Sequence, residues 1–163
     1  MDKKGKETAE NLPGAIELLM ADHKKVKKLF KQFQLLVDNN ADGKERGELA
    51  NSICTEILVH AKIEEKLVYP TFRKELDIDE LIDEAKVEHD SVAALIEQIQ
   101  SSTRKDAIFN AKVKVLGEYV DHHAKEEEGE IFPKANKSKI DLKELGDKIT
   151  AMKEKLMEQK EKY

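Results

Sequence analysis

The sequence predicts an all-α protein, an up-down-up-down four-helix bundle followed by a C-terminal fifth helix. Three observations lead to this fold class: a helix-rich composition, apolar residues spaced three or four positions apart, and an internal duplication. The 163 residues include only 7 Gly and 3 Pro, the residues that most disfavour helix interiors. A chain of this length is expected to form one domain with its own core.

The first helix is expected to begin at Pro13, which suits a first helical turn, after a flexible polar arm over residues 1–11. It should end at the polar stretch 39–43. His23 lies in the middle of its apolar seam, where an apolar residue would be expected. The other seam residues are Ile16, Leu19, Val26, Phe30, Phe33 and Val37.

Three more helices complete the predicted bundle, which spans residues 12–135. The second runs from about residue 44 to 72, with Pro70 kinking its last turn. The third is expected to be capped by Asp77 with Glu80 and to end at 101–103, and the fourth ends near Pro133. Short connections between helices favour antiparallel neighbours.

An amphipathic fifth helix is predicted over residues 139–161, capped by Asp141 with Glu144. Its apolar stripe has to be buried, either on the bundle or on a partner chain, so the protein is expected to be a monomer or a homodimer through this helix. The stripe consists of Leu142, Leu145, Ile149, Met152 and Leu156.

The two halves of the bundle share two sequence patterns. In the first, Asp22-His23-x-x-Val26-x-x-Leu29 matches Glu88-His89-x-x-Val92-x-x-Leu95. In the second, His60-x-x-x-Glu64-Glu65 and His123-x-x-x-Glu127-Glu128 each lead to an aromatic residue and Pro, with equal His-to-Pro gaps (70 − 60 and 133 − 123). Each half is therefore a His helix followed by a His-x-x-x-Glu helix.

Four histidines and two glutamates lie on the apolar seams of these helices. Residues four apart share one helical face, so each His-x-x-x-Glu places an imidazole beside a carboxylate. A lone seam histidine is more often a hydrogen-bonded core residue, and a buried carboxylate is costly unless it is paired or binds a metal. Because six such residues reach one layer of an antiparallel bundle, the pattern predicts a metal site. Its ligands are His23, His60, Glu64, His89, His123 and Glu127.

The predicted ligands constrain the metal. Mixed imidazole and carboxylate donors suit iron, zinc or manganese. Six ligands fit two ions better than one structural zinc, which usually has a closed four-coordinate site. Two iron ions would leave open positions for a small ligand such as dioxygen.

These motifs resemble the hemerythrin-like family, also known as the HHE cation-binding domain, over roughly residues 12–135. The resemblance implies a four-helix bundle with a non-haem di-iron centre. By the same resemblance, His23 and His60 would hold one iron, His89 and His123 the other, and Glu64 and Glu127 would bridge them.

The chain departs from the oxygen-carrying hemerythrins at two positions. Those proteins have a second His one turn after the third-helix His, where this chain has Ala93, and an Asp five residues after the fourth-helix His, where this chain has Glu127 at four. The resemblance therefore favours reaction with dioxygen or peroxide, nitric-oxide binding, or a further protein ligand over simple oxygen carriage. Glu56 and Tyr119, one turn before His60 and His123, are the candidates for that ligand.

The function predicted is a di-iron protein that binds or reacts with a small ligand for sensing, redox protection or iron handling. The alternative is a non-catalytic metal-binding or helical interaction module with a structural or stored metal. Whether the protein is an enzyme is left open.

The net charge of −5, without a concentrated basic region, predicts no nucleic-acid partner. A lone Cys54 and the lack of a long apolar stretch predict a cytoplasmic protein with no membrane association.

Overall fold

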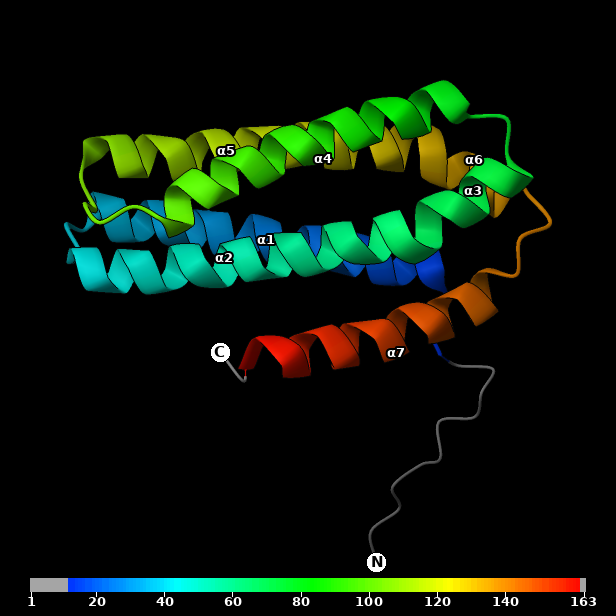
Figure 1. The fold of residues 1–163 in the computed structure, drawn as a ribbon, viewed down its shortest axis with the longest axis horizontal. Coiled ribbons are helices and arrows are strands. Elements are labelled where there is room, and N and C mark those ends of the chain that lie inside the picture. The colour runs from blue at the N-terminus through cyan, green and yellow to red at the C-terminus, as the bar shows by residue number, and fades with distance from the viewer. Residues whose placement is uncertain (1–11, 162–163) are drawn as a thin grey trace, which may run out of the picture.

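The bundle predicted from the sequence is present in the structure, a computed structural model that describes residues 12–161. Four long helices run alternately up and down (Figure 1): α1 (Ala15–Asp38), α2 (Gly43–Ile63), α4 (Asp79–Gln100) and α5 (Ala107–Glu126). Each contacts two neighbours, in the order α1, α2, α4, α5 and back to α1. The predicted fold class is confirmed; the predicted polar arm lies outside the described residues.

Side-chain caps begin two of the four bundle helices. Asp42 accepts a hydrogen bond from the backbone N–H of Glu45 at the start of α2, and Asp106 does the same for Phe109 at the start of α5. The predicted capping box of Asp77 was wrong. The residue before α4 is Ile78, whose aliphatic side chain has no acceptor for a cap and is buried in the core (4% exposed).

The two repeated His-x-x-x-Glu motifs end in π-helical turns rather than in a simple kink. After α2 come η2 (Glu64–Val68) and α3 (Tyr69–Glu75), and after α5 come η3 (Glu127–Ile131) and α6 (Phe132–Asn136). Pro70 lacks an N–H and its ring would clash with the carbonyl four residues back. The backbone therefore widens, and the residue before each Pro donates to the carbonyl five residues back.

The fifth long helix, α7 (Leu142–Glu161), packs along α1 and α2 and extends back toward the other end of the bundle (Figure 1). Asp141 accepts from the N–H of Glu144, as predicted. Leu145 and Ile149 are buried against the bundle. Among residues 12–161, no helix is both long and apolar enough to cross a membrane.

The bundle interior contains two apolar cores with a polar layer between them. One core lies near α7 and the π-helical turns and includes Leu19, Ile63 and Phe132. The other lies toward the opposite end of the bundle and includes Phe33, Ile53 and Leu116. The histidines of all four bundle helices lie where one core gives way to the other.

Candidate metal centre

The six residues predicted as ligands lie together in this polar layer. The four histidines come one each from α1, α2, α4 and α5, and the two glutamates begin the two π-helical turns. The imidazoles are at most 13% exposed and both carboxylates are fully buried. The site is therefore closed to bulk water.

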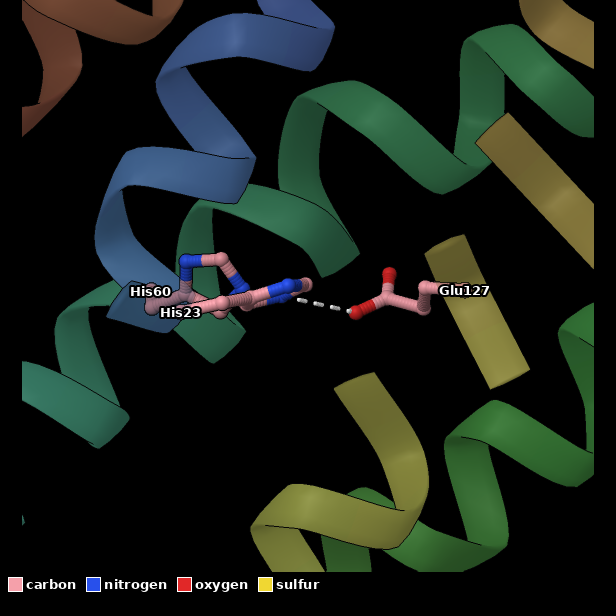
Figure 2. Close-up of side chains that lie close together, drawn as sticks. All are labelled: His23, His60 and Glu127. Atoms are coloured by element: carbon pink, nitrogen blue, oxygen red, sulfur yellow. Dashed lines mark ion pairs between the residues drawn. The ribbon is translucent and has the colours of Figure 1, made fainter. Parts of the chain in front are cut away.

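The donors form two sets of three. His23, His60 and Glu127 make one set, and Glu64, His89 and His123 make the other; within each set the donor atoms lie within 4.8 Å of one another. Figure 2 shows the first set, with the imidazoles from α1 and α2 facing the carboxylate from η3.

Both glutamates also approach imidazoles of both sets. Glu127 Oε1 is 3.3 Å from His23 Nε2 and 3.3 Å from His123 Nε2. Glu64 Oε1 is 3.1 Å from His60 Nε2 and 3.4 Å from His89 Nε2. Each carboxylate thus lies between the two sets, the arrangement required of a bridging ligand.

Four of these atoms are buried and make no hydrogen bond of good geometry in the described part of the chain, although imidazoles and carboxylates lie close enough for ion pairs: His60 Nε2, both oxygens of Glu64, and Glu127 Oε1. A buried polar atom left unpaired is costly, and a buried carboxylate more so. A divalent cation between the two sets would satisfy all four atoms. The donor set fits a pair of metal ions on this observation.

A second layer of carboxylates holds the imidazoles from behind. His60 Nδ1–H donates to Asp22 (2.8 Å) and His123 Nδ1–H donates to Glu88 (3.0 Å). By the same pattern His23 donates to Glu128 (3.0 Å).

For the fourth imidazole, His89 Nδ1 lies 3.7 Å from Glu65 Oε1, too far for a hydrogen bond, so only the other three imidazoles are held in this way. Carboxylates at this position fix the ring orientation and leave the Nε2 lone pair for a metal. The four acidic residues belong to the two repeated patterns. Their duplication was the signal in the sequence, but their partners lie on other helices and depend on the packing.

The buried charges strongly shift the pKa values of two of the imidazoles. Burial alone would lower the pKa of His60, but the charge of Glu64 and the hydrogen bond to Asp22 raise it to about 10. Burial opposes protonation of His123 as well, yet Glu127 and Glu64 raise its pKa to about 12. In this arrangement protons on the imidazoles balance the carboxylates, and a bound cation would displace them.

Tyr69, the first residue of α3, places a hydroxyl inside the cluster. Its Oη donates to Glu127 Oε2 at 3.0 Å and lies 3.1 Å from His123 Nε2 and 3.4 Å from His89 Nε2. Burial, and then the charges of Glu64 and Glu127, raise the pKa of Tyr69 well above its usual value. Sequence reasoning missed this residue, although the aromatic residue before each Pro was part of the repeat.

A cavity of about 40 Å³ adjoins the centre. Its lining includes the four histidines, Glu64 and the apolar residues Val26, Ile57, Val92 and Val120. A volume of about 10–15 Å³ suffices for one water, so the space suits a molecule of a few atoms.

The two residues considered as extra ligands are not part of the cluster. Glu56 pairs with Lys25 at 2.7 Å, and Tyr119 is 49% exposed. Both precede their histidines by one turn, whereas the glutamates follow the histidines by one turn, so Glu56 and Tyr119 lie at a different level along the helix axis from the buried carboxylates. His122 faces outward and pairs with Glu126 at the surface.

Two sets of buried imidazoles and carboxylates inside an antiparallel bundle define a helical metal-binding protein. The sequence profile of the hemerythrin HHE cation-binding domain matches residues 14–135, and the chain belongs to this family.

Two known proteins are similar to the chain. The crystal structure of a hemerythrin HHE cation-binding domain-containing protein from Mycobacterium kansasii shares 25% identity and superposes with a TM-score of 0.73, covering 89% of this chain and 88% of that one. A DNA nickase from Nostoc sp. is 29% identical over 119 residues, which are 71% of this chain and 32% of the nickase. The chain thus spans about a third of that relative's length.

Proposed function

We propose that the protein holds two non-haem iron ions and that a small molecule such as dioxygen, peroxide or nitric oxide binds or reacts at them, in sensing, redox protection or iron handling. The observation that supports this most strongly is the pair of buried His–His–Glu sets that share their carboxylates. His23 and His60 would hold one ion and His89 and His123 the other. Zinc or manganese would suit the same donors.

The residues of the chain prepare the site for this role. The outer carboxylates Asp22 and Glu88 hold Nδ1–H of two imidazoles, so that Nε2 of each is free to bind. The buried Glu64 and Glu127 supply negative charge to both positions. These two glutamates and the apolar residues around the cavity exclude water from the site. Two iron ions bound there would offer open coordination positions and electrons for redox chemistry.

The geometry does not favour simple oxygen carriage. Ala93 is exposed on α4 one turn after His89 and lines an outer groove between α2 and α4. No imidazole therefore occupies that place, and the ion at His89 and His123 would keep a position for another ligand. A cytoplasmic location and a small-molecule partner remain predictions from the sequence.

The alternative is a metal-binding module without turnover, in which the metal is structural or stored. It would use the same donors. The much longer relative from Nostoc is a DNA nickase, and we do not propose that this chain nicks DNA.

Metal analysis combined with optical spectra separates these possibilities. The chain is purified, reconstituted with iron(II) under nitrogen, and then exposed to air. Two irons per chain and a visible absorption band that changes with oxygen or azide would support the di-iron proposal. Two metal ions with spectra indifferent to both ligands would favour the alternative, and iron content near zero would overturn both metal proposals.

A further inference from the structure

Tyr69 contributes one more oxygen atom at the place where the metal donors meet. Its hydroxyl has three polar neighbours, Glu127 Oε2, His123 Nε2 and His89 Nε2, at 3.0, 3.1 and 3.4 Å. All three belong to residues assigned above to the metal pair. We propose that Tyr69 Oη is a seventh protein donor, which binds as a phenolate to the ion held by His89 and His123. This inference rests on the proposed di-iron function.

The surroundings of the hydroxyl are those of a ligand rather than of an ordinary core tyrosine. His123 donates its Nδ1–H to Glu88, so its Nε2 faces the cluster and offers a lone pair once a metal has displaced the proton on that nitrogen. His89 Nε2 is only 3.1 Å away from this atom. A metal-bound Nε2 cannot donate to the phenol, and two nitrogens with one oxygen converging on a point make a typical mixed donor set.

The π-helical turn explains how Tyr69 reaches this place. In a regular α-helix a residue five positions after Glu64 would lie about 140° around the axis from it. Here the N–H of Tyr69 bonds to the carbonyl of Glu64, because Pro70 prevents the regular pattern. The wider turn brings both side chains into one site, and π-turns of this kind are frequent at functional sites.

The second half of the bundle lacks this donor. The equivalent residue is Phe132, whose ring stacks on His23 at 5.9 Å between centroids. A phenyl ring has no donor atom that could bind a metal ion. The two ions would therefore be unequal. The additional oxygen would serve the ion on the α4 side, where Ala93 supplies no imidazole.

Binding as a phenolate needs no electron transfer. The phenol O–H bond breaks, an oxygen–metal bond forms, and the released proton is taken up by the solvent buffer. For the test, iron(II) is added to the full chain and oxidised by the dioxygen of air. A tyrosinate bound to iron(III) has a visible charge-transfer band, and excitation into that band enhances the ring vibrations of the tyrosinate in resonance Raman spectra.

The experiment compares the wild type with Tyr69→Phe and, as a matched control, Tyr119→Phe, which alters a half-exposed tyrosine of α5. We expect the band and the tyrosinate vibrations in the wild type and the control, and their complete loss in Tyr69→Phe with two irons still bound. If Tyr69→Phe fails to fold, the wild-type Raman spectrum decides by the presence of tyrosinate vibrations.

Two results would overturn the inference. They are two bound irons in the wild type without tyrosinate vibrations, and a band that survives in Tyr69→Phe. Either would leave the proposed function intact. Failure of the wild type to bind iron would instead overturn the proposed function and this inference with it.

Discussion

Replacing Asp22 by Asn should lower the metal affinity of one position and leave that of the other nearly unchanged. Asp22 accepts the Nδ1–H of His60 at 2.8 Å, and its side chain is only 12% exposed. The substitution keeps the shape and an acceptor oxygen but removes the charge that holds the imidazole. It therefore probes whether the outer carboxylates orient His60 for metal binding.

The size of the effect follows from this contact. A hydrogen bond to a charged group contributes about 1.5–3 kcal/mol, and loss of an outer-shell partner lowers metal affinity about 10–100-fold. Since tenfold corresponds to about 1.4 kcal/mol, the two ranges agree. The ion at His23 and His60 should weaken by this factor, while the ion at His89 and His123 should change by less than about threefold.

Chelator competition under nitrogen, with iron(II), measures both affinities. Asp22 also accepts a hydrogen bond from Lys153 Nζ on α7 at 2.5 Å. Lys153→Met removes this second contact alone and should lower the metal affinity less than Asp22→Asn does. Asp90→Asn is the matched control, because Asp90 follows His89 but pairs with Lys86 at the surface. Equal losses in Asp90→Asn, or an unchanged affinity in Asp22→Asn, would refute the reasoning.

Three further predictions follow from burial and charge. Glu64 and Glu127 raise the pKa of His60 to about 10 and of His123 to about 12 against burial. Protonation of these imidazoles therefore stabilises the metal-free fold fully below pH 6.5, and this stabilisation is lost as the pH rises toward those values. The melting temperature measured in EDTA should fall steadily above pH 6.5, and a flat profile would contradict this. Ile149→Ala should lower the free energy of unfolding by about 2–5 kcal/mol, since Ile149 is 2% exposed between α7 and the bundle. Urea unfolding at several protein concentrations tests this, and a loss under about 1 kcal/mol, or one that depends on protein concentration, would argue against packing within the chain. Burial raises the pKa of the Cys54 thiol to about 12, so a disulfide reagent should label it only on unfolding, and rapid labelling of the folded protein would disagree.

Helical periodicity was enough to predict the bundle and to collect the six candidate ligands. Residues such as His23 and Glu64 interrupt apolar seams, and the duplication showed that the interruption occurs at the same depth in both halves. The seam alone could not show which carboxylate holds which imidazole. The contact between Asp22 and His60 joins two helices, and it exists only once α1 and α2 have packed.

The details near the two prolines depended on backbone geometry that a regular period does not describe. A regular helix places Tyr69 off the face of Glu64, so its position in the cluster was missed. The regular period instead directs attention to Tyr119, one turn from His123. The π-helical turn after Glu64 changes the register by one residue, which brings Tyr69 into the cluster. A second error had a similar cause: burial of Ile78 moved the start of α4 past Asp77.

Anomalous diffraction from crystals of the iron-loaded protein tests the central claim most directly, because it counts the ions and places them. We predict two iron peaks inside the bundle, one beside His23 and His60 and the other beside His89 and His123. A single peak, no peak, or iron only at the surface group of Glu88, His122 and Glu126 would contradict a buried two-iron centre.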